Sequence, residues 1–183
     1  EGEHEAVLTV NDEEAGRYTF TVQEMALVPF EDPEGVFAIS YPPDFDDIEQ
    51  ELDEGSYATT FDAPGGSSII YVYFGDIGQS LTDEQWNSFT EDYSLAGLSG
   101  FGEDTVELDR KLGGSGSHVL YLEVESEETD LHGLAWVEES DGILAVVVLI
   151  VPIDEWPARG AELKASLETF TWWPDAAQAV LGE

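Results

Sequence analysis

The nine-residue apolar run from Ile143 to Val151 constrains the fold more than any other feature of this chain. It reads ILAVVVLIV, is rich in β-branched residues, and is bounded by Asp141-Gly142 and by Pro152. An unbroken apolar run of this length is typical of a strand that is covered on both faces. It is much shorter than the roughly twenty residues that a membrane-spanning helix requires. We therefore expect a central strand in a layered domain.

Alternating apolar and polar residues predict further strands on either side of this run. Segment 6–28 is predicted to form an N-terminal β-hairpin, with strands at 7–10 and 17–22 joined by a turn-forming stretch. A strand from Phe37 to Tyr41 is closed by two prolines. The other predicted strands are 57–61, 69–74, 105–112, 118–124 and 131–137.

The clearest helix signal begins at Thr82. Its hydroxyl and the side chain of Gln85 have the spacing of a capping box, and Leu81 and Trp86 that of a hydrophobic staple. These residues predict a helix over about 83–95, with Gly97 as a left-handed stop.

Three other segments carry weaker signals. A last helix is predicted to begin near Asp154 or the pair Trp156-Pro157 and to close near residue 170. Segment 44–54 is predicted to be a short surface helix, or a loop anchored by its pinning residues Phe45, Ile48 and Leu52, and 174–183 a short Ala-rich tail. The predicted fold is a single α+β domain, 1–183, in which helices pack on an antiparallel sheet.

The charge of the chain constrains its solvent and its partners. Forty-one acidic residues stand against five basic ones, a formal net charge of −36, while 42% of residues are hydrophobic. Such a charge opposes folding by self-repulsion unless salt screens it, and at 1 M salt the screening length is about 3 Å. We expect a halophilic protein whose acidic surface holds hydrated K⁺ and Na⁺ ions. Nucleic acid is excluded as a partner because its phosphates carry the same sign of charge.

The motifs of common enzyme classes are missing from the sequence. There is no Cys, which excludes disulfides and thiolate metal sites. Ser115 follows Gly113 but precedes Ser117, so the Gly-x-Ser-x-Gly elbow of hydrolases is absent, and there is no Gly-Lys-Ser/Thr phosphate-binding loop. We expect a non-catalytic domain without a cofactor.

Two histidines are the candidates for a metal site. His118 and His132 fall in predicted strands, and if those strands pair, the two rings could meet near Glu123 or Glu138. The alternative, which we favour, is that both are satisfied or half-exposed strand residues without a metal. Metal binding is therefore not expected.

Tryptophans near the last helix are the candidates for a docking surface. Trp156, Trp172 and Trp173 flank this helix. Adjacent tryptophans in a regular element cannot both point inward, so Trp172 or Trp173 is expected to be available for contact with a partner.

From Val36 to Thr171 the order of elements resembles the PsbP-like superfamily. The residues that carry the resemblance are the strand Phe37 to Tyr41 with Pro42 and Phe45, the turn at Asp141-Gly142, and the closing segment Ser166 to Phe170. Phe45 stands where the family more often has Trp, and the hairpin at 6–28 extends the pattern. The resemblance implies an α/β/α sandwich and a mostly non-catalytic accessory domain that docks on a larger protein complex.

The resemblance also implies a compartment and leaves a second function open. Such domains often lie outside the cytoplasm, so we expect a cell-envelope or secreted protein anchored by a segment upstream of Glu1; the cytoplasm of a salt-accumulating halophile is the alternative. The alternative function is a structural subunit of a halophile virion, surface layer or filament, because a strand-rich chain also suits such assemblies.

Overall fold

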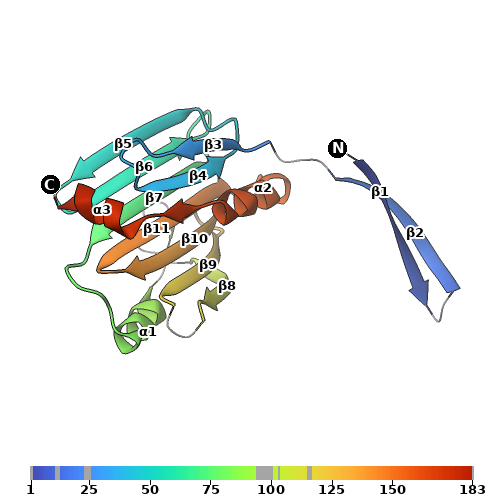
Figure 1. Cartoon of the computed structure of the whole chain (residues 1–183). Coiled ribbons are helices and arrows are strands. Elements are labelled where there is room, and N and C mark those ends of the chain that lie inside the picture. Colours follow the sequence, from blue (N-terminus) through green and yellow to red (C-terminus); the bar gives the residue numbers. More distant parts are fainter. Residues whose placement is uncertain are drawn as a thin grey trace.

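A seven-stranded antiparallel sheet organises the protein (Figure 1). The computed structural model describes residues 2–10, 13–22, 26–93, 101–102, 104–114 and 117–182. In spatial order the sheet contains β5 (Asp47–Asp53), β6 (Ser56–Asp62), β7 (Ile69–Asp76), β11 (Ile143–Pro152), β10 (Leu131–Ser140), β9 (Val119–Ser126) and β8 (Val106–Leu112).

The apolar run lies at the centre of this sheet, as the sequence predicts. It forms β11, which pairs with β10 on one side and β7 on the other. Val147 is fully buried between its register partners Trp136 and Val72. Both faces of the strand are covered, since Val147 and Leu149 belong to one apolar cluster and Val146 and Val148 to another. The prediction of a central strand is confirmed.

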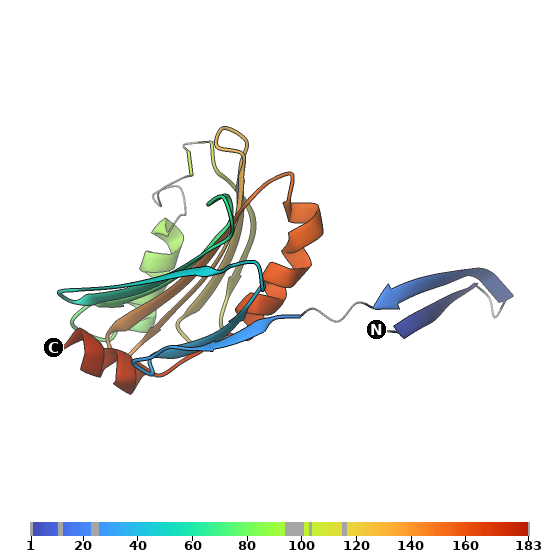
Figure 2. The same ribbon diagram turned by 90° about the horizontal axis from the view of Figure 1, so that it is seen from above.

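Different elements cover the two faces (Figure 2). On one face lie α2 (Trp156–Glu168), α3 (Pro174–Leu181) and a small sheet of β12 (Thr171–Trp172), β4 (Phe37–Tyr41) and β3 (Val28–Glu31). On the other lies α1 (Asp83–Asp92), whose Trp86 packs against buried residues of β9 and β10. The predicted class, an α+β fold with helices on an antiparallel sheet, is confirmed.

The helix α1 begins where its capping box predicts. Thr82 accepts a hydrogen bond from the backbone of Gln85, and the Gln85 side chain accepts one from the backbone of Thr82. The helix ends at Asp92, with Tyr93 as its cap residue in an extended conformation. Gly97, predicted as the stop, lies outside the described residues.

The N-terminal hairpin forms a sheet of its own. β1 (Gly2–Val10) and β2 (Glu13–Val22) pair only with each other among the described strands. The predicted range of 6–28 was too long at its end, because Val28 begins β3, which pairs with β4.

The prediction of a helix or loop over 44–54 is wrong. Asp47–Asp53 is an edge strand, β5, that pairs with β6. The helical spacing of its apolar residues is outweighed by the turn at Gly55, which has φ +77° and folds the chain back onto β6. Of the pinning residues, Phe45 is fully buried, whereas Leu52 is exposed on β5.

The segment predicted as a tail is also ordered. It forms α3, in which Ala177 is fully buried and Leu181 nearly so, both within the cluster that contains Phe37. Ala-rich composition suits close approach of a short helix to a sheet. Removing 174–183 would therefore uncover part of the core.

Candidate docking site around Trp173

The two histidines do not form a common site. His118 faces α1, where its ring stacks on Trp86 with ring centroids 5.3 Å apart. His132 faces α2, where its ring stacks on Trp156 at 3.7 Å. The predicted strands do pair, as β9 and β10, but the two rings lie on opposite faces of the sheet. His118 precedes β9 and lies beside Glu139 near the end of β10, whereas His132 lies near the start of β10. The hypothesis that the two rings meet is wrong.

Each histidine instead contacts two carboxylates. His118 Nδ1 lies 2.5 Å from Glu139 Oε2, and its Nε2 lies 3.2 Å from Asp83 Oδ1. The pKa of His118 is raised, first by the hydrogen bond to Glu139 and further by Asp83, against an opposing effect of desolvation. His132 is 1% exposed, and its two nitrogens contact Glu123 and Glu125. In the part of the chain that the structure describes, no group of three or more ligating side chains is arranged to hold a metal ion.

The adjacent tryptophans point in different directions, as the sequence predicts. The indole of Trp172 packs against Phe74 at 5.7 Å, and its Nε1 donates a hydrogen bond of 3.0 Å to Glu138. Trp173 is 49% exposed. Trp156, the third candidate, is half-buried by its stack on His132 and offers less surface. Trp173 is therefore the member of this set available to a partner.

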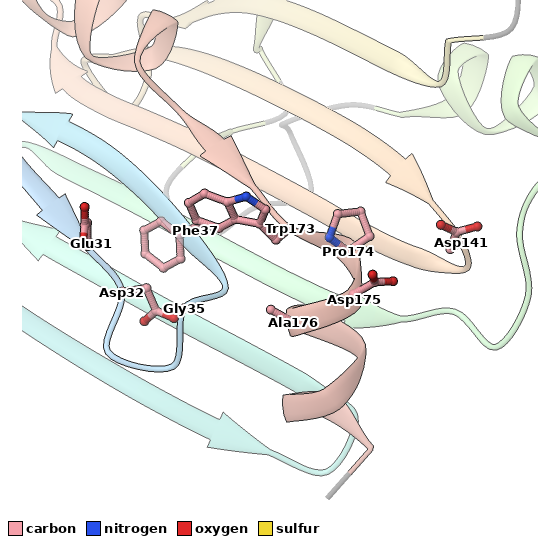
Figure 3. Close-up of a pocket in the computed structure, with 9 residues that line it drawn as sticks. All are labelled: Glu31, Asp32, Gly35, Phe37, Asp141, Trp173, Pro174, Asp175 and Ala176. Carbon is pink, nitrogen blue, oxygen red and sulfur yellow. The ribbon is translucent and has the colours of Figure 1, made fainter.

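Trp173 lines an open hollow of about 670 Å³. Figure 3 shows that the hollow is formed by the β3–β4 turn, the start of α3 and the β10–β11 turn. We call it the Trp173 hollow; its lining residues are Glu31, Asp32, Gly35, Phe37, Asp141, Trp173, Pro174, Asp175 and Ala176.

Hydrogen bonds hold the backbone of this hollow in place. Asp32 accepts from the backbone N–H of Val36 at 2.9 Å, from Gln50 Nε2 at 2.9 Å, and from the Tyr57 hydroxyl. The backbone N–H of Trp173 donates to the carbonyl of Val36 at 2.9 Å. The exposed indole thus stands on a hydrogen-bonded base, and a backbone held in this way has less freedom to lose when a partner binds.

The charge of the hollow has one sign. Its lining contains four carboxylates, from Glu31, Asp32, Asp141 and Asp175, and no basic residue among the described side chains. An exposed indole bordered by carboxylates suits a cationic group that can lie on the ring face while its charge is neutralised. The chemistry therefore favours a basic partner surface.

Sequence patterns did not single out the acidic residues of the hollow. Asp32 lies in the breaker 31–35 and Asp141 in a tight turn, and neither differs locally from the many other acids in turns. Only Trp173 carried a signal, because it follows another tryptophan.

Comparisons with known proteins identify the fold. No protein-family model and no curated protein matches the sequence. The solution structure of cyanobacterial PsbP from Synechocystis is similar with a TM-score of 0.58, 14% identity, and coverage of 83% of this chain and 95% of that one.

Two crystal structures match less well. One, a Pseudomonas aeruginosa protein described as a putative regulator, has a TM-score of 0.46 and 14% identity over 81% of this chain and 98% of that chain. The other, from Bacteroides thetaiotaomicron, has a TM-score of 0.42 and 15% identity over 80% of this chain and 48% of that chain.

Across the described residues no helix has the length and apolarity needed to span a membrane. On the strength of the cyanobacterial structure, this chain has the PsbP-like fold.

Proposed function

We propose that this protein is a non-catalytic accessory domain that docks on a larger protein complex through the Trp173 hollow. The observation that carries the proposal is the half-exposed indole of Trp173 on a hydrogen-bonded base. Aromatic residues that stand in hollows are the ones that most often dominate binding energy at protein interfaces.

The partner surface should present a basic side chain beside an apolar one. A Lys or Arg can contact the indole face, and the carboxylates of Glu31 and Asp175 in the same lining attract its charge. Electrostatic attraction of a basic surface to this strongly acidic chain also speeds their encounter, and salt weakens that effect.

A catalytic role has less support. In the described part of the chain, the ring nitrogens of His118 and His132 are engaged by carboxylates, which orient a ring but supply no nucleophile. We also propose an extracytoplasmic location with an anchor upstream of the present chain, in keeping with the habits of PsbP-like domains.

The test is affinity capture of a native partner by three forms of the chain. The wild type and Leu52→Ala should retain the same protein, since Leu52 is exposed to a similar degree, 55% against 49% for Trp173, but lies on the edge strand β5. Trp173→Ala should retain at least tenfold less, with its melting temperature unchanged. Equal capture by all three forms, or the absence of any saturable partner, would refute docking through Trp173.

A structural subunit is the second candidate, and the edge strand β8 favours it. Three large apolar residues of this strand, Val106, Leu108 and Leu112, are 51–58% exposed. We expect a monomer, or at most a weak dimer, by light scattering in 3 M KCl. Discrete high-order oligomers or filaments under those conditions would favour the subunit over the accessory domain.

A further inference from the structure

A second cavity, of about 490 Å³, is lined by residues of β8, β9, β10 and the C-terminal half of α2. Its volume is in the range of small-molecule sites. We call it the lysine cavity; it is lined by Asp109, Lys111, Tyr121, Glu123, Trp136, Lys164, Leu167, Glu168 and Phe170.

The first observation is that both lysines of the chain line this cavity. The whole sequence contains only two lysines, Lys111 and Lys164, whereas its acidic residues are spread along the chain. A lysine that merely offset a carboxylate could stand almost anywhere on such a surface. Here β8 and α2 bring together two lysines that are 53 positions apart in the sequence, and the same lining holds the carboxylates of Asp109, Glu123 and Glu168.

The lysines retain donors for a ligand. Lys164 Nζ donates to Glu123 Oε2 at 2.9 Å, and Lys111 Nζ donates to Asp109. An ammonium group has three N–H donors, so one carboxylate each does not saturate them. The side chains are 68% exposed for Lys111 and 45% for Lys164, so both heads can turn toward an occupant.

The floor of the cavity is aromatic. Tyr121 and Trp136 are register partners on β9 and β10, so their side chains stand side by side on the face toward α2. Phe170 meets Trp136 edge to face, with centroids 5.1 Å apart. The Tyr121 hydroxyl donates to Glu123 Oε2 at 3.1 Å, which fixes the ring, and Lys111 Nζ lies over this ring, 5.1 Å from its centroid.

We propose that the lysine cavity binds a small planar aromatic molecule that carries one anionic group, a carboxylate or a sulfonate. The ring lies against Tyr121 and Trp136, and the anion accepts hydrogen bonds from Lys111 and Lys164. Long-range repulsion by the acidic surface falls away in molar salt, whereas a stacked ring and direct hydrogen bonds persist. This site is independent of docking through Trp173.

Three probes with the same ring system test the proposal by calorimetry in 3 M KCl. They are 2-naphthoate, 2-naphthylmethanol and 2-(aminomethyl)naphthalene, which are anionic, neutral and cationic. We expect 2-naphthoate to bind at least tenfold more tightly than the amine. Equal or tighter binding of the amine, or no binding of 2-naphthoate, would overturn the proposal.

The lysines are tested with a matched control. The double variant Lys111→Gln, Lys164→Gln should bind 2-naphthoate at least tenfold more weakly than the wild type. Its affinity for 2-naphthylmethanol should fall less than twofold. Arg159→Gln also removes a cation, but Arg159 contacts Asp44 outside the cavity, so both affinities should stay unchanged. If the double variant fails to melt cooperatively, Lys111→Gln alone should weaken 2-naphthoate at least threefold. Undiminished binding in the folded variant would contradict the role of the lysines.

The place of binding is read from the indole N–H signals. In a ¹⁵N-resolved NMR titration, 2-naphthoate should shift the signal of Trp136 and leave that of Trp173 in place. A shift at Trp173 alone would move the ligand to the other hollow and overturn the assignment. Loss of the Trp136 shift in the lysine double variant would show that Trp136 and the two lysines belong to the same binding site.

Discussion

The imidazole of His132 lies nearly parallel to the indole of Trp156, with ring centroids 3.7 Å apart and an interplanar angle of 17°. This contact joins β10 to the first turn of α2. On the same helix, Gly160 lies one turn further along and is buried under the indole. A Cβ atom at position 160 would stand 2.9 Å from Trp156 Cε2, closer than packed atoms approach.

Gly160→Ala should therefore destabilise the protein. Alanine in a helix is normally better than glycine by about 1 kcal/mol, but here the added methyl group must push the Trp156 indole away from His132. We expect a lower melting temperature by circular dichroism. The control is Ala161→Gly on the exposed side of α2, which should cost about 1 kcal/mol through helix propensity alone. A more stable Gly160→Ala variant would contradict the packing of Trp156.

Val147→Asp should abolish folding. Val147 is fully buried at the centre of β11, so a carboxylate there would be desolvated without a partner, at a cost of several kcal/mol. Leu52→Asp is the matched control, because it introduces the same group on the exposed edge strand β5 and should change stability little. Thermal melts of both variants are the measurement. A cooperative transition in Val147→Asp close to that of the wild type would show that β11 is not central.

His118 should make stability depend on pH. Its pKa in the folded protein is raised, chiefly by Glu139, above an unfolded value of about 6.5. The stabilisation is therefore fully present below about pH 6.5 and is lost as the pH rises through the folded pKa. The difference in stability between wild type and His118→Gln should shrink over that window.

Asp83→Asn is the companion variant, because it removes one of the two carboxylates at His118 and keeps Glu139. It should reduce the pH dependence without eliminating it. Denaturant melts at several pH values from 6 to 9 measure both effects. A wild-type to His118→Gln difference that grew with pH would have the wrong sign for this contact.

Stability should rise steeply with KCl between 0.1 M and 3 M, and the chain should be largely unfolded at the low end. The reason is the formal net charge of −36, whose repulsion salt screens. Melting curves by circular dichroism measure the effect. A sucrose series is the control, because sucrose favours burial without screening charge and should stabilise much less. Curves that were flat or reversed in KCl would refute a halophilic adaptation.

Local patterns predicted the elements whose signals lie within a few residues of each other. The run from Ile143 to Val151 is the central strand, and Thr82 with Gln85 caps α1. The strand is recognised from an unbroken apolar run, and the helix start from two residues within one helical turn. Patterns of this kind can be seen in the sequence itself. The same holds for the divergence of Trp172 and Trp173, since neighbouring side chains alternate in an extended segment.

Local patterns failed where pairing between distant segments decides the structure. The spacing of Phe45, Ile48 and Leu52 suits a helix, yet pairing with β6 draws 47–53 into a strand. The Ala-rich end has only two large apolar residues, Val180 and Leu181, and its contact with the apolar cluster that contains Phe37 makes it a buried helix. Pairing with β6 overrides the local preference of 47–53, whereas the helix of 174–181 agrees with its Ala content and only its burial depends on tertiary contacts.

The sequence by itself determined the acidic character, the central strand and the antiparallel α+β class, and it predicted that Trp172 or Trp173 would not point inward. Only the tertiary structure decided which side chains share a site. It separated His118 from His132 and brought Lys111 together with Lys164. The physical reason is that a cavity depends on which strands pair, in which register they pair, and which helix covers them. These pairings bring together residues that lie far apart in the sequence and at no regular spacing.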